Sequence, residues 1–396
     1  MRRAEIRGLS ELAGELLTAG GDVVSDMHAG IAARPFGALG PAARPVQVIH
    51  DGISSAVYSG VRGGLRAIAH GGGRLAALGS EDGVRAGSTP RGALALGALN
   101  GLYGDRLQAA GNALALPMTI RRDGEPGPRI AVFVHGLCET DAAWGGPPFG
   151  GEPERPTYGD RLRDELGITP LYVRYNSGLH ISDNGRLLAE ALDELEQGWP
   201  GPLDEITLVG HSMGGLVVRS ACHYAAAGGL RWAESVAHVF CLGTPHLGAD
   251  LEKGANVLGW ALGQLPETRA LGRVVNSRSA GIKDLRYGGC IEEDWRDRDP
   301  DELLRDRCAE LPFLPGVGYY FVAASLREDS LGSLIGDLLV RLPSASGRGS
   351  GRGRRIRFEL DNGYELTGVT HLDLLNHPDV LGQLRRWISR AGRTRQ

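Results

Sequence analysis

The sequence predicts an α/β protein with a mostly parallel sheet and helices on both of its faces. From about residue 129 onward, short apolar runs rich in β-branched residues end at glycines or turn residues, as buried parallel strands do. Amphipathic helical stretches separate several of these runs. The clearest, "NGRLLAEALDELEQ", places four leucines on one helical face: Leu187, Leu188, Leu192 and Leu195. Strands that alternate with helices in this way are typical of a parallel sheet.

The region before this pattern differs from it. We expect an N-terminal helical extension over residues 1–122, a turn-rich boundary at "RRDGEPGP", and the α/β domain over residues 123–396. One segment of the extension repeats apolar residues at helical spacing and carries a small residue every fourth position. The apolar set is Val46, Ile49, Ile53, Val57, Val61 and Ile68, and the small set is Gly52, Ala56, Gly60 and Gly64. We interpret this pattern as a face buried against the main domain, with a peripheral membrane contact as the alternative.

Five strands are expected in the α/β domain. In chain order they are "RIAVFVHG", "TPLYVRYNSG", "EITLVGHS", "VAHVFCLGTP" and "VGYYFVAASL". A long insertion at residues 250–315 separates the last two, and loops of this length are usually functional, so we expect a lid or substrate-binding cap. A Gly-, Ser- and Arg-rich piece at residues 344–355 predicts a flexible loop.

Composition narrows the class of partner and compartment. The 396 residues are 42% hydrophobic with a net charge of −4, which suits a soluble protein and gives no reason to expect a nucleic-acid partner. The five cysteines have no CxxC or zinc spacing, so we expect no metal or other cofactor and a reducing, cytoplasmic location. No uncharged apolar run is long enough for a membrane span, and the start lacks the apolar core of a signal peptide. The oligomeric state does not follow from these features.

The segment "LVGHSMGGLVV" contains the strongest chemical signal. Gly210, His211, Ser212, Met213 and Gly214 fit the pattern G-x-S-x-G, between an expected strand and an expected helix. A strand that turns sharply into a helix exposes the serine at the tip of the turn. The flanking glycines have no Cβ to clash, and the start of the helix offers free N–H groups to an oxyanion. We therefore predict Ser212 as a nucleophile, with Gly210, His211 and Gly214 forming its elbow.

A serine nucleophile needs a histidine base, which in this arrangement follows it in the chain. The best histidine is His371, because Thr370 and Asp373 fit a capping box that sets it at a helix entrance. His377 is the local rival, but it lies further into the element. His246 precedes the expected acid, so we expect it to line the pocket instead.

The expected acid lies between the serine and the histidine. Asp337, in "SLIGDLLVRLPSAS", follows the strand "GYYFVAASL" and is the best candidate to hold the imidazole. Glu328 and Asp329 lie nearer the end of that strand and remain alternatives.

The oxyanion needs two backbone donors. One is the N–H of Met213, directly after the nucleophile. The other should follow the strand "AVFVHGL", where Leu137 is the first choice and Cys138 the alternative. His135 and Gly136 end that strand and are expected at the pocket. The serine elbow argues against a cysteine nucleophile at position 138.

With these pieces in place, the chain resembles an α/β-hydrolase of the lipase and esterase superfamily. The resemblance covers residues 129–387 and rests on "FVHGL", "LVGHSMGG", "CLGTPHLGA", "GDLLV" and "THLDLLNHP". Within the superfamily the segments are similar to bacterial triacylglycerol lipases and to the GPI-inositol-deacylase-like branch. The resemblance implies Ser212, Asp337 and His371 as the triad, and it implies hydrolysis of carboxylic esters.

Three hypotheses on function follow. The first is a serine hydrolase of lipid-like esters, with Trp260, Leu262 and Leu265 of the insertion as a candidate acyl site. The second is an acyltransferase that uses the same triad and passes the acyl group to an alcohol or thiol. The third is a non-catalytic scaffold apposed to a membrane. The substrate's acyl length and alcohol portion do not follow from the sequence.

Overall fold

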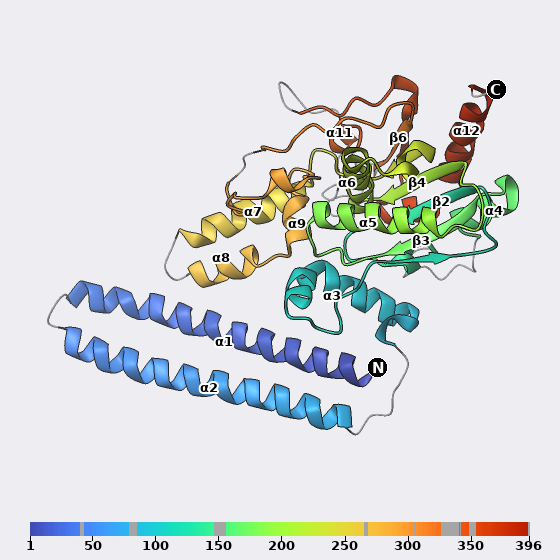
Figure 1. The fold of residues 1–396 in the computed structure, drawn as a ribbon. Helices are drawn as coiled ribbons and strands as arrows, with labels where there is room; N and C mark the ends of the chain where they lie inside the picture. The colour runs from blue at the N-terminus through green and yellow to red at the C-terminus, as the bar shows by residue number, and fades with distance from the viewer. Residues whose placement is uncertain are drawn as a thin grey trace.

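A seven-stranded sheet forms the centre of the molecule in the computed structural model (Figure 1), which describes residues 1–39, 43–78, 85–145, 156–264, 268–303, 306–325, 340, 342–347 and 354–394. The strand order is β1-β3-β2-β4-β5-β6-β7. All neighbouring strands are parallel except β1, which runs antiparallel to β3 at one edge. The strands are β1 (Thr119–Arg122), β2 (Arg129–Val134), β3 (Thr169–Arg174), β4 (Glu205–His211), β5 (Val236–Leu242), β6 (Gly318–Ser325) and β7 (Gly363–Thr367).

The predicted fold class is confirmed, and the five expected strands are β2 to β6. Successive side chains of a strand point to opposite faces. In β2, Ile130, Val132 and Val134 therefore enter one apolar core, while Ala131 and Phe133 enter the other. Both cores are closed to solvent, which is why these strands read as continuous apolar runs.

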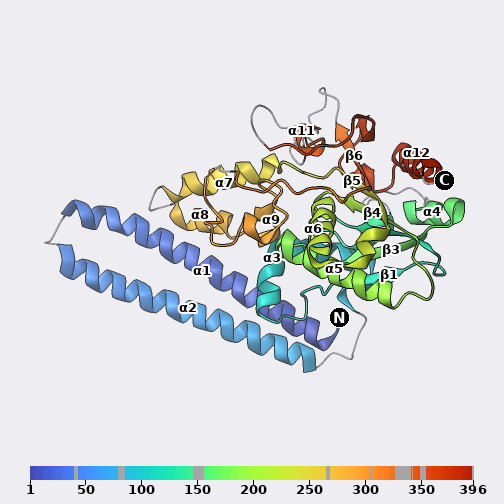
Figure 2. The same ribbon diagram turned by 45° about the horizontal axis from the view of Figure 1, so that its top comes forward.

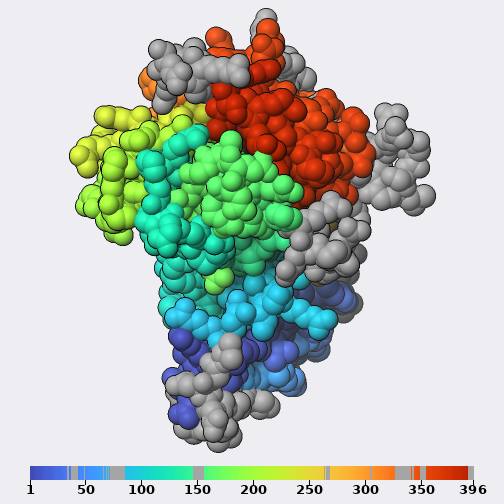
Figure 3. Space-filling model, turned by 90° about the vertical axis from the view of Figure 1, so that its right-hand side faces the viewer, coloured from blue at the N-terminus to red at the C-terminus, as the bar shows by residue number. Residues whose placement is uncertain are grey.

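Helices cover both faces of the sheet (Figures 1 and 2). Two of them, α5 (Ile181–Gln197) and α6 (Met213–Gly228), close the first core. The other two, α4 (Tyr158–Leu166) and α12 (Pro378–Thr394), lie over the second core. Figure 3 shows α12 in red beside the green residues of α4, where Arg385 pairs with Glu165 at 2.7 Å.

The expected insertion lies between β5 and β6. It contains three helices, α7 (Asp250–Gly263), α8 (Arg269–Asn276) and α9 (Ala280–Asp284). Shorter elements complete the domain: η3 (Asp141–Gly145), η4 (Arg231–Ser235), η5 (Glu292–Asp294), α11 (Leu342–Ala345), η6 (Leu360–Asn362) and η7 (Leu372–Leu375). The piece expected to be a flexible loop, residues 344–355, starts inside α11, and residues 348–353 of it lie outside the described residues.

The N-terminal region is largely helical, as predicted. A long hairpin of α1 (Arg3–Leu39) and α2 (Arg44–Leu78) projects beside the α/β domain, followed by η2 (Ala86–Ser88) and α3 (Pro90–Ala109) (Figure 1). The last four residues of the expected helical region instead form β1, because "TIRR" finds backbone partners along the edge of β3. The domain boundary at residue 122 stays a prediction. None of the described helices is long and apolar enough to cross a membrane.

One expectation for this region is wrong. We expected the apolar positions of residues 46–68 to be buried against the main domain, but Val46, Ile53, Val57 and Val61 of α2 are exposed. The reason is geometric: α1 lies between α2 and the domain, contacting α2 on one side and α8 on the other (Figure 1). Helical periodicity shows that a helix has an apolar face but not what covers it.

Candidate active site

Ser212 lies at the turn between β4 and α6. The strand ends at His211 and the helix begins at Met213, as the sequence predicts. Ser212 has φ 52° and ψ −123°, a conformation that costs a non-glycine residue of order 1–3 kcal/mol. Its N–H donates to the carbonyl oxygen of Leu242 at the end of β5 (2.8 Å), so the turn is held by the neighbouring strand. Strain of this kind that the surroundings maintain is common at reactive groups.

The glycines around Ser212 are dictated by close backbone contacts. A Cβ on Gly210 would lie 2.4 Å from the nitrogen of Gly215, and a Cβ on Gly214 would lie 2.2 Å from the carbonyl oxygen of Val134. A Cβ on Gly215 would lie 2.0 Å from Thr244 Oγ1. These distances are far below van der Waals contact. The elbow therefore depends on glycine at each of these positions.

The loop after β2 faces the serine. A Cβ on Gly136 would lie 3.0 Å from Ser212 Cβ, so the loop passes directly beside the candidate nucleophile. Among the described residues, the N–H groups of Leu137 and Met213 have no hydrogen-bond acceptor. The N–H of Cys138 donates instead to Ser177 Oγ (3.2 Å). This favours Leu137 over Cys138 as the second oxyanion donor.

Cys138 has no features of a nucleophile. Its thiol lies 3.9 Å from the carbonyl oxygen of Ala98. Burial, with a contribution from Glu139, raises the pKa of Cys138 to about 11. The thiol is therefore neutral at pH 7 and a weak nucleophile.

His135 has a role in holding the loop after β2. Its ring is fully buried and stacked on Tyr175 with centroids 4.2 Å apart. Its Nε2 accepts the N–H of Tyr175 (3.3 Å), so Nδ1 carries the proton and donates to the carbonyl oxygen of Gly136 (2.9 Å). Burial lowers the pKa of His135, which keeps this neutral tautomer. The His135 ring is thus buried behind the loop after β2, and its place at a substrate pocket stays a prediction.

A buried ion pair connects three parts of the site, and sequence reasoning missed one of its members. Glu139 Oε2 accepts the N–H of Gly136 (2.7 Å), and the Glu139 carboxylate lies 3.1 Å from His211 Nδ1. The other nitrogen of His211, Nε2, lies 3.1 Å from the carbonyl oxygen of His371. Carboxylate and carbonyl oxygens only accept, so both nitrogens of His211 donate and the ring is an imidazolium. Glu139 thereby links the loop after β2, the residue before Ser212, and the backbone of His371.

The charges in this pair shift both pKa values. Burial opposes ionisation of Glu139, but the charge and hydrogen bond of His211, together with the Gly136 N–H, lower its pKa to about 2. Burial likewise opposes the charge on His211, but Glu139 raises the pKa of His211 above its ordinary value. Each partner thus favours the charged form of the other.

His371 reaches the same end of the sheet from the far side of β7. Its ring lies against Gly243, where a Cβ would be 2.8 Å from His371 Nδ1, and its centroid is 4.8 Å from that of His211. Burial and the positive charge of His211 lower the pKa of His371 to about 3, so the ring is neutral at pH 7. Among the described residues, no hydrogen bond joins the His371 ring to Ser212 Oγ.

The local structure around His371 agrees with the predicted cap. Asp373 Oδ2 accepts from Thr370 N (2.7 Å) and Oγ1 (2.8 Å), and Asp373 N–H donates to Thr370 Oγ1 (3.3 Å). The following element is the short η7, and α12 begins only at Pro378. The rival His377 points into this junction, because its Nδ1 accepts the N–H of Asp379 (3.2 Å).

The remaining predicted residues lie elsewhere or outside the described residues. Asp337, Glu328 and Asp329 all fall in residues 326–339, which the structure does not describe. His246 is fully buried, and its Nδ1 accepts from Arg219 Nη1 (3.2 Å). Burial and the charge of Arg219 hold the pKa of His246 well below its ordinary value. Its position in a substrate pocket stays a prediction.

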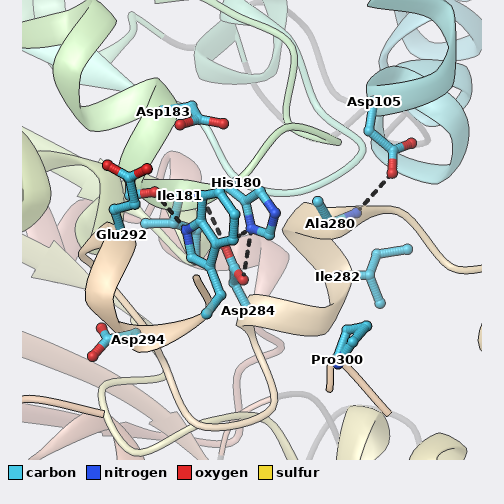
Figure 4. A network of polar contacts seen from close by, with 12 residues as sticks. Asp105, His180, Ile181, Asp183, Ala280, Ile282, Asp284, Glu292, Asp294 and Pro300 are labelled. Atoms are coloured by element: carbon cyan, nitrogen blue, oxygen red, sulfur yellow. Dashed lines mark hydrogen bonds and ion pairs between the residues drawn. The ribbon is translucent and has the colours of Figure 1, made fainter. Parts of the chain in front are cut away.

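The insertion is anchored beside the site by a buried polar network (Figure 4). The Asp284 carboxylate at the end of α9 contacts His180 Nδ1 (3.1 Å) and accepts the N–H of Ile181 at the start of α5 (2.8 Å). The His180 ring stacks on Trp295 of the insertion with centroids 3.7 Å apart. A Cβ on Gly281 would lie 3.1 Å from Met213 Cε. The insertion therefore touches the residue that follows Ser212.

One helix of the N-terminal region also supports the site. Three glycines on one face of α3 lie where a Cβ would clash with the loops behind the serine. A Cβ on Gly97 would meet the Glu139 carbonyl oxygen at 2.8 Å, one on Gly101 would meet Cys138 Sγ at 2.4 Å, and one on Gly104 would meet Asn176 Oδ1 at 1.8 Å. Sequence reasoning found no role for this region. The four- and three-residue spacing of these glycines was the signal for it.

A family model and several solved structures are similar to parts of this chain. Residues 175–263, which include the elbow, match the family model described as the PGAP1-like alpha/beta domain. The mature form of lipase BlEst2 from Bacillus licheniformis is similar at 18% identity and a TM-score of 0.42, covering 70% of this chain and 99% of that chain. A lipase-esterase related protein from Clostridium acetobutylicum is similar at 13% identity and a TM-score of 0.38, covering 68% and 99%.

A third structure, alpha/beta hydrolase domain-containing protein 10 from mouse, is similar at 11% identity and a TM-score of 0.36, covering 70% of this chain and 95% of that chain. Comparison with curated protein sequences found no match. The chain has the mostly parallel sheet and the strand–serine–helix turn of an α/β-hydrolase fold, and residues 175–263 of it match that family model.

Proposed function

We propose that the protein is a serine hydrolase that cleaves carboxylic esters with lipid-like acyl groups. The observation that carries the proposal is the conformation of Ser212: a strained serine at the tip of β4, beside two backbone N–H groups that have no acceptor among the described residues. An ordinary glycine turn needs neither feature. A preorganised pair of donors is what a tetrahedral oxyanion requires.

In the proposed reaction, Ser212 Oγ attacks the ester carbonyl while His371 takes its proton. The N–H groups of Leu137 and Met213 bind the oxyanion, and collapse expels the alcohol with the proton returned by His371. Water, activated by the same histidine, then hydrolyses the acyl-enzyme. Asp337 is the proposed acid that fixes the imidazole tautomer. Glu139 and His211 are positioning residues that hold the loop after β2 and the backbone of His371.

The lipid-like character of the substrate is supported by the insertion. Leu251, Leu258 and Trp260 of α7 are exposed, and Leu262 is half-buried. Leu265 lies outside the described residues. Exposed large apolar side chains on an insertion that contacts Met213 through Gly281 favour an apolar acyl group over a small polar one.

The test is a series of p-nitrophenyl esters of increasing acyl length, with labelling by a fluorophosphonate probe. We expect turnover and labelling in the wild type and the loss of both in Ser212→Ala, with a rate loss on the order of 10⁴-fold or more. Ser235→Ala is the matched control, because Ser235 Oγ donates to the Leu203 carbonyl oxygen at the opposite end of the sheet. This control variant should keep full activity, and circular dichroism checks the fold of both variants.

The same assay separates the alternatives. Preferential formation of a new ester when an alcohol is added would make the protein an acyltransferase. A rate maximum at the shortest acyl chains would remove the lipid-like part of the proposal. If no ester is turned over and no probe labels Ser212, the hydrolase proposal fails and a scaffold role takes its place.

A further inference from the structure

The α1–α2 hairpin has an apolar face that no described residue covers. Nine large aliphatic side chains on it are between 42% and 62% exposed: Leu9, Leu16, Leu17, Val24, Ile31, Val46, Ile53, Val57 and Val61. Spacings of seven or eight residues on α1, and of seven and four on α2, bring them back to the same side of each helix. Scattered exposed leucines are ordinary, but a continuous stripe along two helices is not.

Contacts between the helices show that the two stripes form one surface. The sides on which α1 and α2 meet are marked by Gly14 against Ala69 and by Asp22 paired with Arg62 at 2.5 Å. Each stripe lies roughly 140° around its helix from this line, at about 100° per residue. Because the helices are antiparallel, the same sense of rotation puts both stripes on one side of the hairpin.

The α/β domain lies on the other side. Leu12 of α1 is buried with Leu107 and Leu114, and Asp26 pairs with Arg273 of α8. Acidic residues of α1, namely Glu11, Glu15, Asp22 and Asp26, are likewise turned away from the stripe at helical spacing. The exposed face is therefore apolar, uncharged and directed away from the enzyme domain.

We infer that this face, centred on Val24, Val57 and Gly60, binds the same face of a second copy of this chain to form a dimer. Two hairpins stacked in this way make a four-helix bundle, and a two-fold axis closes the assembly because each hairpin presents the same patch. The inference is independent of the reaction at Ser212.

The available area is sufficient for a stable dimer. The exposed aliphatic residues of α1 run from Leu9 to Ile31, roughly 35 Å at about 1.5 Å per residue. Two helices packed about 9 Å apart present a face roughly 20 Å wide. The product is about 700 Å², within the range of about 600–1,000 Å² per partner in a standard specific interface.

Glycines on the face favour a protein partner over a membrane. Gly20, Gly60 and Gly64 lie among the aliphatic residues, and a Cβ on any of them would meet nothing within 4 Å. Each glycine destabilises its helix relative to alanine. A lipid surface makes no interaction that requires glycine and so does not offset this destabilisation. A second helix can, because its backbone approaches closely over glycines.

The experiment measures the mass of the full-length protein by light scattering during size-exclusion chromatography, over a wide concentration range. We expect twice the chain mass of 42.0 kDa for the wild type. Val57→Asp places a charge in the centre of the face and should weaken the dimer about 100-fold or more. Val48→Asp is the matched control, because Val48 is 71% exposed on the opposite side of the same helix. The control should remain a dimer.

Gly60→Leu provides a second variant without an added charge, and it should also weaken the dimer by blocking close approach. Circular dichroism and esterase turnover of each variant show that the chain is folded. A monomeric wild type would overturn the inference, as would equal dissociation of Val57→Asp and Val48→Asp. If the wild type is monomeric and binds phosphatidylcholine–phosphatidylglycerol vesicles, and Val57→Asp abolishes that binding, a membrane is the occupant instead.

Discussion

Glycine has opposite surroundings in two regions of this molecule. At the elbow, a Cβ on Gly210, Gly214 or Gly215 would lie within 2.4 Å of another atom. On the hairpin, a Cβ on Gly60, Gly63 or other glycines of α2 would meet no atom within 4 Å. The first set is required by contacts inside the chain. The second set has no such requirement, although each member lowers the stability of its helix.

This difference shows what requires glycine in each region. The elbow is determined by the folded chain itself, because β2, β4 and α6 meet around Ser212. No contact inside the chain accounts for the glycines of the aliphatic stripe, such as Gly60, and the proposed dimer would account for them. Substitutions at the two kinds of glycine should therefore separate the active site from the assembly.

The largest effect is expected at the elbow. Gly214→Ala would push a methyl group against the carbonyl oxygen of Val134, which is backbone and cannot move aside. We expect loss of measurable esterase turnover and a lower melting temperature by circular dichroism. Gly228→Ala, at the other end of α6, should be near neutral, because its Cβ would meet only Leu230 side-chain atoms at 3.7 Å or more. Full activity in Gly214→Ala would contradict the tight elbow.

The next effect concerns Asp337, the proposed acid. Asp337→Asn should lower kcat on the order of 10⁴-fold, because an amide stabilises neither the required imidazole tautomer nor the imidazolium. Glu328→Gln and Asp329→Asn, from the same stretch of chain, should stay within a few-fold of the wild type. Single-turnover kinetics with a p-nitrophenyl ester measures each. A large loss in Glu328→Gln or Asp329→Asn, with an active Asp337→Asn, would move the acid to that residue.

A smaller effect is expected at the buried pair behind the serine. Glu139→Gln should lower the free energy of unfolding by about 3 kcal/mol, because it leaves the buried His211 without its counter-charge. Glu139 has a lowered pKa, so its contribution is present above its ordinary value of 4.5 and is lost as pH falls toward about 2. His211 has a raised pKa, so its contribution is complete below its ordinary value of 6.5 and is lost as pH rises through the raised value.

The stability difference between the wild type and Glu139→Gln should therefore be largest between about pH 4.5 and 6.5 and should shrink on both sides. Urea unfolding at a series of pH values measures it. A difference that does not vary with pH would show that Glu139 acts only through its hydrogen bond to Gly136.

The candidate site was partly predictable, because the positions of its candidate nucleophile and base follow from patterns within the sequence itself. The change from strand to helix periodicity places Ser212 at a turn, and the chain order selects His371 over His246. Glu139 could not be found in this way, because its partner His211 is 72 residues away and the pairing depends on how β2 and β4 lie together. The glycine face of α3 was missed for the same reason.

The fold was predictable to a similar depth. Continuous apolar runs identify β2 to β6, because a strand buried on both faces carries apolar residues at successive positions and does not alternate apolar with polar ones. The edge strand β1 carries two arginines and was assigned to the helical region, because an exposed antiparallel edge has no such signature. The exposure of Val57 was beyond reach, since periodicity is identical whether an apolar helix face is covered by the same chain, by another chain or by nothing.

The smallest effect is expected for the exposed glycines of the α1–α2 hairpin. Gly52→Ala, about 140° around α2 from Val57 at about 100° per residue, should stabilise the helix by about 0.5–1 kcal/mol and leave the dimer unchanged. Gly60→Ala, on the stripe, gains the same helix propensity but adds a methyl group where a second hairpin would approach. We expect it to raise the dimer dissociation constant severalfold in sedimentation analysis. If both substitutions stabilise the protein equally and neither changes the dimer dissociation constant, no partner helix packs against Gly60.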